Sequence, residues 1–400
     1  MLDLKADHHL KLLRGAREFF AALVVAIDAS RYEVRLETYI FSVQASGEGV
    51  AQALIRAALR GVTVCLVVDG VGTPGFPAPW PERLNAAGVQ WRIFSPLGRF
   101  GLLVPSRWRR LHRKLCVVDG WVAFCGGINV MDDWFDPNHG ALDAPRFDFA
   151  VRVHGALVQE VHLAMTQFWW RLQAVQSARQ VDWPGAWQAL QQVVRQARLA
   201  DELPDQPGGG ARARLVLRDN LRNRSRIERA YRLALGEARQ EIILANAYFL
   251  PGRKIRKSLM HAAQRGVRVR LLLQGRYEYF MQHHATRALY ADLLATGVEI
   301  YEYHQSFLHA KVAVVDGHWA TVGSSNMDPL SLLLAREANL VIEDASFAQC
   351  LRHELEFAMT NHARRLDRQQ HSQRPWWQKL LDHSALLLMR LLLVVNGKRY

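Results

Sequence analysis

The chain has 400 residues, half of them apolar, and a net charge of +14 with a pI near 10. This length suits two or three domains with a sizeable core, and the charge predicts anionic partners such as nucleic acid, acidic lipid surfaces or phosphorylated substrates. The four cysteines form no Cys-x-x-Cys pair, which argues against a zinc site or a disulfide framework. No signal peptide and no spanning helix are expected, because the longest apolar run is too short.

In chain order, the sequence predicts two copies of one α/β unit. Residues 33–41 and 241–249 are predicted strands, each followed by a helical pattern, an Arg-Gly-Val turn and a continuous apolar strand at 64–68 or 269–273. Such continuous apolar strands are typical of a sheet covered by helices on both faces. We therefore expect a class of two tandem α/β domains, each with a mostly buried central β-sheet flanked by helices.

The predicted domain boundaries follow composition. The stretch 201–214 is rich in proline and glycine and is the expected linker between a domain at 1–200 and a domain at 215–365. A basic and then apolar tail occupies 366–400. Two interpretations of this tail stay open: a helix that packs on the core, or a helix that lies in a membrane surface beside the Trp376–Trp377 pair.

A short motif, His-x-Lys-x-x-x-x-Asp, occurs twice, 197 residues apart. The stretches 111–127 and 308–324 align without gaps, with nine of seventeen positions identical. The motif residues are His112, Lys114 and Asp119 in the first copy, and His309, Lys311 and Asp316 in the second. In a strand each His and Lys would share one face. Each Asp precedes Gly between apolar runs, so we expect both aspartates to shape hairpin turns and bind nearby backbone.

Further polar residues accompany each copy. Asn129, Ser324 and Asn326 follow the returning strands and are candidate phosphate-binding residues. Asp148 and Glu337 each precede a later apolar strand and could accept a ring N–H from a motif histidine, fixing its tautomer. Assembled around one phosphate, one histidine would attack phosphorus while the other protonates the leaving oxygen. This chemistry needs no metal.

At these residues the sequence resembles the phospholipase D superfamily, whose signature is the duplicated His-Lys-Asp motif with a following Gly-Ser turn. The second copy, LHAKVAVVDGHWATVGSSNMDPLS, fits closely, whereas the first departs with GGINVMDDWF and has Gly127 opposite Ser324. More narrowly, LETYIF, RRLHRK, ANAYFLPG and HWATVGSSNMDPLSL resemble bacterial cardiolipin synthases of the B type. The resemblance implies two tandem phospholipase D-like domains related by pseudo-two-fold symmetry. It also implies that all six motif residues, including Asp119 and Asp316, are catalytic.

The same resemblance implies a function. A phosphatidyl group would pass from phosphatidylglycerol to a lipid or small-alcohol hydroxyl through a phosphohistidine, with His112 as the nucleophile and without a cofactor. The alternatives are hydrolysis of the phospholipase D type, or a phosphodiesterase acting on nucleic acid. Expected partners are anionic phospholipids and a membrane surface, with no nucleic acid and no obligate protein partner. The expected location is the bacterial inner membrane, peripheral, on its cytoplasmic face.

The loop 94–110 precedes the first motif and mixes apolar side chains with arginines. It is predicted to be either an interfacial loop that contacts lipid or an ordinary surface loop with an apolar anchor. The residues on which this hypothesis depends are Phe100, Leu102, Leu103 and Trp108.

Overall fold

The computed structural model describes residues 4–98, 101, 104–136, 139–201, 210–219, 223, 225–278, 280–328 and 335–395. The chain folds into two compact units. The N-terminal unit comprises residues 4–132 and Ala150–Leu215, and the C-terminal unit comprises Asp133–Phe149 and the described residues from Val216 on. The division at Leu215 falls directly after the expected linker, of which 202–209 lie outside the described residues. Asp133–Phe149 belongs to the first half of the sequence but packs within the C-terminal unit.

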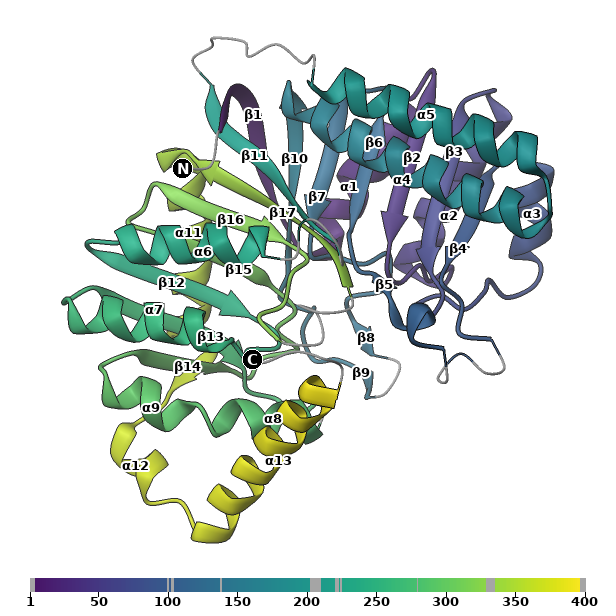
Figure 1. Ribbon diagram of the computed structural model, residues 1–400. Helices are drawn as coiled ribbons and strands as arrows, with labels where there is room; N and C mark the ends of the chain where they lie inside the picture. The colour runs from purple at the N-terminus through teal and green to yellow at the C-terminus, as the bar shows by residue number, and fades with distance from the viewer. Residues whose placement is uncertain are drawn as a thin grey trace. The chain divides into compact units, whose positions relative to one another are not determined.

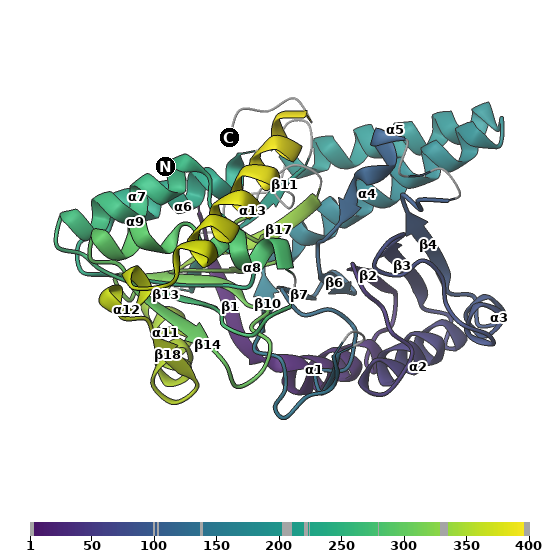
Figure 2. The same cartoon turned by 90° about the horizontal axis from the view of Figure 1, so that it is seen from below.

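The N-terminal unit is built on a sheet with the strand order β11-β1-β10-β7-β6-β2-β3-β4. Helices α1, α2 and α3 lie on one side of it and α4 and α5 on the other (Figure 2). Its elements, in chain order, are β1 (Lys5–Arg14), α1 (Gly15–Asp28), β2 (Glu33–Thr38), α2 (Ser46–Leu59), β3 (Thr63–Asp69), α3 (Trp80–Ala86), β4 (Gln90–Phe94), the 3₁₀ helix η2 (Pro105–Trp108), β5 (Arg110–Leu111), β6 (Leu115–Val118), β7 (Val122–Gly126), β10 (Phe149–Gly155), α4 (Leu157–Arg179), α5 (Trp183–Asp201) and β11 (Ala211–Arg218).

The C-terminal unit has a sheet with the order β18-β14-β13-β12-β15-β16-β17. Helices α6, α7 and α9 cover one face and α11 covers the other (Figures 1 and 2). Its elements are β8 (Phe135–Asp136), β9 (Gly140–Ala141), α6 (Arg226–Glu237), β12 (Glu241–Asn246), α7 (Arg253–Gln264), β13 (Arg268–Gln274), α8 (Phe280–Arg287), α9 (Tyr290–Ala295), β14 (Glu299–Tyr303), β15 (Lys311–Val315), β16 (Trp319–Gly323), β17 (Ala335–Glu343), α11 (Ala345–Asn361), β18 (Ala363–Arg365), α12 (Arg368–Ser372) and α13 (Trp376–Val395).

The two sheets confirm the predicted α/β class and the predicted buried strands. β2, β3 and β4 run parallel to one another, as do β12, β13 and β14, while β6 and β15 pair antiparallel with β2 and β12. Six consecutive residues of β3, from Val64 to Asp69, are buried, and so are Val269–Leu273 of β13. Helices on both faces leave no exposed side for a polar residue, which explains the continuous apolar runs.

The repeat extends to the turns that end the first covering helices. Gly61 and Gly266 have φ angles of 88° and 89°, a left-handed conformation that glycine adopts without a steric cost. The N–H groups of the following valines, Val62 and Val267, donate at 3.1 Å to the carbonyls of Ala57 and Ala262. This is the Schellman geometry that ends a helix. In both copies of the repeat it leads the backbone into the next strand, β3 or β13, at the same position of the alignment.

The tail folds into helix α13, which packs against α8 (yellow and green in Figure 1). Its buried positions Ala385, Leu386 and Met389 join a small cluster with Ala285 and Leu289. The buried carboxylate of Asp382 binds the ring of His284 at 2.7 Å and pairs with Arg374 at 2.5 Å. Within the described residues, no helix is long and apolar enough to span a bilayer. One face of the tail therefore packs on the core, as one of the two interpretations expected.

Candidate active site

His309 is held by a carboxylate from a distant part of the chain. Its Nδ1 lies 2.6 Å from Oδ2 of Asp148, and both residues belong to the C-terminal unit. The backbone explains this contact, because the N–H groups of His309 and Ala310 both donate to the carbonyl of Phe147, at 2.9 and 3.0 Å. Asp148 is buried and its other oxygen accepts the N–H of Phe149 at 2.8 Å. In a neutral ring this contact places the proton on Nδ1 and the lone pair on Nε2.

Lys311 begins strand β15 and is fully buried. Its Nζ donates to the carbonyl oxygen of His309, which ties the two motif residues together. Burial lowers the pKa of Lys311 to about 8, against the opposing effect of four carboxylates. These carboxylates are Asp148, Glu337, Glu278 and Asp328. A buried ammonium group surrounded in this way is suited to hold the charge that develops on phosphoryl oxygens.

Ser324 and Glu337, both predicted site residues, contact each other. The Ser324 hydroxyl donates to Oε2 of Glu337 at 2.5 Å and accepts the N–H of Ala338 at 3.0 Å. Glu337 is fully buried. Its contact with Ser324 shows that this carboxylate has a structural partner at the end of β16. Asn326 is buried two residues further on.

The first motif is arranged similarly around a different neighbour. Nζ of Lys114 donates to the carbonyl of His112 at 2.9 Å, as in the second copy. The imidazole of His112 lies with its centroid 5.1 Å from that of the Tyr39 ring, and Nζ of Lys114 lies 5.7 Å from the same ring. Oδ1 of Asn129 accepts the N–H of Ile40 at 3.2 Å. Its amide NH₂ group is thus the end available to donate to an anion.

The motif histidines do not lie within regular strands, which corrects the expected geometry. β6 begins at Leu115 and β15 at Lys311, so residues 112–114 and 309–310 precede the strands. In the first copy the ladder ends where the carbonyl of Lys114 accepts a long 3.3 Å bond from the N–H of Gly126. In both copies the lysine is instead tied to the backbone of the motif histidine, because its Nζ donates to the histidine carbonyl.

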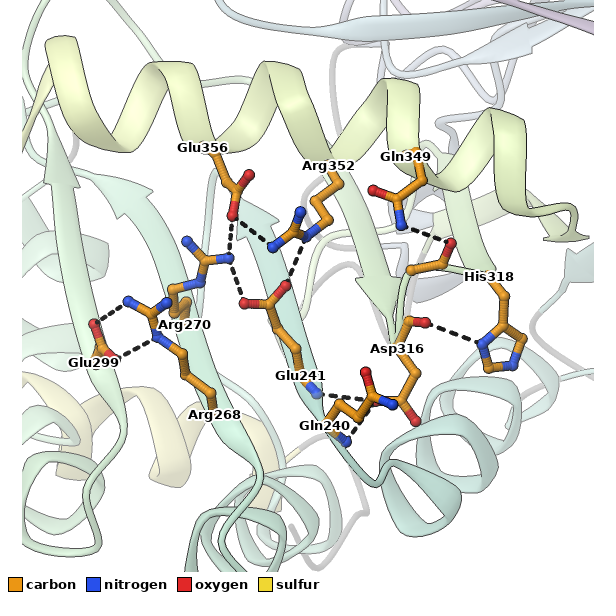
Figure 3. A network of polar contacts seen from close by, with 11 residues as sticks. Gln240, Glu241, Arg268, Arg270, Glu299, Asp316, His318, Gln349, Arg352 and Glu356 are labelled. Carbon is orange, nitrogen blue, oxygen red and sulfur yellow. Dashed lines mark hydrogen bonds and ion pairs between the residues drawn. The ribbon is translucent and has the colours of Figure 1, made fainter.

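Both motif aspartates sit in hairpin turns, as predicted. Asp119 and Asp316 have φ angles of 53° and 49°, and the glycines that follow also have positive φ, which defines type I′ turns. The Asp316 carboxylate accepts the backbone N–H groups of Gln240 and Glu241 at 2.8 and 2.9 Å (Figure 3). It also accepts the N–H of Arg239 at 2.9 Å. The matching bonds to Asp119, from Arg31, Tyr32 and Glu33, are each 2.8 Å. Both carboxylates thus fix the start of a central strand.

The sequence predictions missed two residues near the motifs. Tyr39 lies in the LETYIF stretch, where an aromatic residue is ordinary for a strand end. Glu278 lies in a connection after β13 that has no counterpart motif, yet its charge acts on Lys311. Neither position carries a spacing signal that would single it out. Only the folded structure shows that Tyr39 lies beside His112 and that Glu278 lies near Lys311.

The loop hypothesis depends on four residues, of which the structure describes one. Phe100, Leu102 and Leu103 lie outside the described residues. Trp108 ends the short helix η2 and is half-buried. Arg110 pairs with the buried Asp69 at 3.1 Å, so this arginine serves the fold.

The duplicated His-Lys-Asp sites on two α/β units define a phospholipase D-like protein. The family model described as "Cardiolipin synthase, PLD-like domain" matches residues 23–142 and 231–358, one match for each copy of the repeat. The chain belongs to this family.

Several proteins resemble the chain over most of its length. Cardiolipin synthase B of Escherichia coli K12 is 36% identical over 93% of this chain and 86% of that protein. Cardiolipin synthase B of Salmonella typhi is 37% identical over the same shares. The cardiolipin synthase of Alkalihalophilus pseudofirmus is 28% identical, over 96% of this chain and 72% of its own length.

Among solved structures, the phosphatidylserine synthase of Haemophilus influenzae superposes with a TM-score of 0.68 over 98% of this chain and 97% of that one. Its sequence identity is 12%, so the likeness supports the fold alone. The polyphosphate kinase of Porphyromonas gingivalis matches with a TM-score of 0.56 over 91% of this chain and 49% of its own, at 15% identity.

Proposed function

We propose that the protein is a phosphatidyltransferase that makes cardiolipin from two molecules of phosphatidylglycerol and releases glycerol. The observation that carries this proposal is the His309–Asp148 pair beside the buried Lys311, in a motif that is repeated at His112 and Lys114. Family membership and relatives named cardiolipin synthase B support the lipid substrate. Because the motif is duplicated, both copies would serve one reaction.

The two histidines have different roles in this proposal. Nε2 of His112 attacks phosphorus, the bond from phosphorus to the glycerol oxygen breaks, and that oxygen takes a proton from His309. In the second step the hydroxyl oxygen of the acceptor attacks phosphorus, the phosphorus–nitrogen bond to His112 breaks, and the acceptor proton passes to His309. A carboxylate at 2.6 Å stabilises the charged imidazolium, which suits His309 to the acid role. Lys114, Lys311 and the two asparagines would hold the non-bridging oxygens.

A product assay tests the function directly. The purified protein with phosphatidylglycerol vesicles should yield cardiolipin and glycerol in equal amounts, measured by mass spectrometry and an enzymatic glycerol assay. Phosphatidic acid as the sole lipid product would instead indicate a hydrolase, and cleavage of DNA or RNA without lipid turnover would indicate a nuclease. His112→Ala and His309→Ala should each abolish turnover, whereas substantial activity in either would refute a shared reaction.

Quenching the reaction in denaturant at mildly alkaline pH preserves the acid-labile phosphorus–nitrogen bond, and peptide mapping then tests which histidine has which role. The phosphatidyl adduct should be found on His112, and His309→Ala should retain any adduct that forms because the acceptor step lacks its base. An adduct on His309 would reverse the two roles while leaving the transferase function in place.

We also propose that the protein works peripherally at the cell membrane through the outer face of α13. At 3.6 residues per turn, the buried positions of this helix and its exposed apolar positions lie on opposite faces. The exposed apolar side chains are Trp376, Trp377, Leu380, Leu387, Leu388 and Leu391, each 49–75% exposed. The exposed Lys379 and Arg390 flank this face and would favour anionic lipid headgroups.

Vesicle co-sedimentation tests the membrane proposal. Substituting Leu380, Leu387 and Leu391 with serine should release the protein from phosphatidylglycerol vesicles, because the apolar area for insertion is lost. Leu59 of α2, which is 69% exposed, offers a control, since Leu59→Ser removes an exposed leucine away from α13. Unchanged binding of the triple variant would exclude α13 as the lipid contact.

A further inference from the structure

A polar pocket lies beside the second motif, within the C-terminal unit. It has an empty volume of about 410 Å³, counting its open mouth. It is formed where β12 and β13 end and helix α8 begins. The polar side chains that line it include Tyr248, Gln274, Arg276, Glu278, Gln282 and Arg287.

Strand register places this pocket next to the motif. Asn246 of β12 is paired with Lys311 on one side and Leu273 on the other, and the pocket wall begins at the next residue, Ala247. The N–H of Ala247 donates to the carbonyl of Ala310 at 3.0 Å. On the other strand, Oε1 of Gln274 accepts the N–H of Leu308 at 3.4 Å. Two walls of the pocket are thus bonded directly to the residues on either side of His309.

The pocket offers hydrogen-bonding groups that the described part of the protein does not use. Nη1 of Arg276, Nε of Arg287 and Oε1 of Gln282 are buried and have no hydrogen-bond partner among the described residues. Buried polar atoms of this kind are costly unless a ligand or water satisfies them. Because two are donors and one is an acceptor, a group that both donates and accepts would complement them.

The charge of the pocket is close to balanced. Arg276 and Arg287 are offset by Glu278 and Glu302, which also line the pocket. Burial and the neighbouring Arg287 lower the pKa of His283 to about 4, so its ring is neutral at physiological pH. Burial raises the pKa of Glu278, although Tyr248 donates to this carboxyl at 2.9 Å. With charges of both signs in balance, the pocket has no net attraction for an anion, whereas a hydroxyl group can donate to a carboxylate and accept from a guanidinium group.

We propose that this pocket binds the hydroxyl-bearing head of the acceptor alcohol, a glycerol-like polyol, and positions one hydroxyl at the second motif. The proposal rests on the transferase function proposed above. In the step it serves, the acceptor oxygen forms a bond to phosphorus, the phosphorus–nitrogen bond to histidine breaks, and the acceptor proton passes to the other motif histidine. Water competes for the same phosphorus, so occupancy of the pocket decides between transfer and hydrolysis.

The test measures the ratio of products in variants that change polarity but little volume. Glu278→Gln and Thr286→Val alter two pocket side chains. Each should lower the ratio of cardiolipin to phosphatidic acid about tenfold, the factor expected for one lost hydrogen bond. Each should also raise, by about the same factor, the concentration of free glycerol that half-saturates its exchange into phosphatidylglycerol. Glu299→Gln is the matched control, because Glu299 bonds Arg268 at 2.9 Å at the opposite end of the strands (Figure 3).

The outcomes separate this inference from the proposed function. If the wild-type protein yields neither cardiolipin nor glycerol, the transferase function itself is wrong. If the wild type transfers normally and both variants keep its product ratio and its half-saturating glycerol concentration, the pocket does not bind the acceptor. An equal change in Glu299→Gln would also overturn the inference, since the effect would not be specific to the pocket. Circular dichroism verifies folding, and Thr286→Val decides the question alone if Glu278→Gln fails to fold.

Discussion

The two motif copies share a backbone but differ in what surrounds the histidine. In both, the lysine ammonium donates to the carbonyl of the motif histidine, and the aspartate of an Asp-Gly turn binds the start of a central strand, β2 or β12. In the first copy Tyr39 stands against His112. Aligning 33–41 with 241–249 puts Ala247 at the Tyr39 position, and Ala247 opens onto the pocket. The two copies therefore position the histidine and lysine in the same way but differ in the side chains that surround them.

The ends of the middle strands differ in the same sense. The N–H of Leu111 donates to Oδ2 of Asp69 at 2.7 Å, and Asp69 is paired with Arg110. At the corresponding place Leu308 donates to the neutral Gln274. The first copy is closed by an ion pair, while the second presents an uncharged amide toward the pocket. This difference predicts that the second copy handles an uncharged alcohol.

The largest effect is expected from Asp148→Asn, which tests whether the second histidine depends on its carboxylate. The amide cannot stabilise a charged imidazolium and can hold the ring in the wrong tautomer, so kcat should fall on the order of 10³- to 10⁴-fold. Glu82→Gln is the control, since Glu82 is an exposed carboxylate of α3, away from both motifs. Steady-state rates with phosphatidylglycerol vesicles provide the measurement, and a loss below tenfold would mean that His309 works without this pair.

A second prediction concerns Lys311 and pH. Because its pKa is about 8, the rate should fall as pH rises through that value and the ammonium loses its proton. Lys311→Met should lower kcat about 10²- to 10³-fold. The unfolded chain keeps this proton up to about pH 10.4, so the unfolded state binds more protons between these values. The stability of the wild type relative to Lys311→Met should therefore rise with pH in that window.

Urea unfolding at two pH values, one near neutrality and one inside the window, measures this stability difference. Lys379→Met, which removes an exposed lysine, serves as the control. A stability difference that falls with rising pH would contradict the lowered pKa. A rate that stays constant across the window would show that the charge of Lys311 is not needed for turnover.

A smaller effect is expected from Ala247→Tyr, which gives the second copy the residue of the first. The ring would take up space in the pocket that Ala247 lines, so transfer to glycerol should fall about tenfold while formation of the phosphohistidine persists. Product ratios and adduct mass report the two steps separately. Ala247→Ser is the control of small volume, and unchanged transfer in the tyrosine variant would show that the pocket is not the route of the acceptor.

The smallest effect on activity is expected from the turn aspartates. Burial would raise the pKa of Asp316, but three backbone N–H bonds outweigh it and hold the pKa below its usual value. This contribution to stability is present at neutral pH and is lost as pH falls below the ordinary aspartate range. Asp316→Asn should lower the free energy of unfolding by about 1–3 kcal/mol, and Asp119→Asn by a similar amount. Urea denaturation measures both, and a loss of activity without destabilisation would favour a direct catalytic role.

Local patterns predicted much of this fold. The continuous apolar runs indicated β3 and β13 because helices cover both sheet faces, and the Asp-Gly pairs indicated type I′ hairpins because only such turns favour positive φ at both central positions. The contact between Asp148 and His309 was not assigned to a particular histidine, since it joins segments 161 residues apart. The position of Glu278 and the pocket could not be predicted, because both form where several strand ends come together from separate parts of the sequence.

The origin of Asp148 has a consequence for how this protein can be divided or inherited. The carboxylate that orients the second motif lies on a segment encoded before the linker, so a fragment that begins at Gly210 would contain His309 and Lys311 but not their acidic partner. Separately produced halves should stay inactive until they are mixed and the segment Asp133–Phe149 finds its place. Deleting the first copy together with this segment would remove the carboxylate partner of His309.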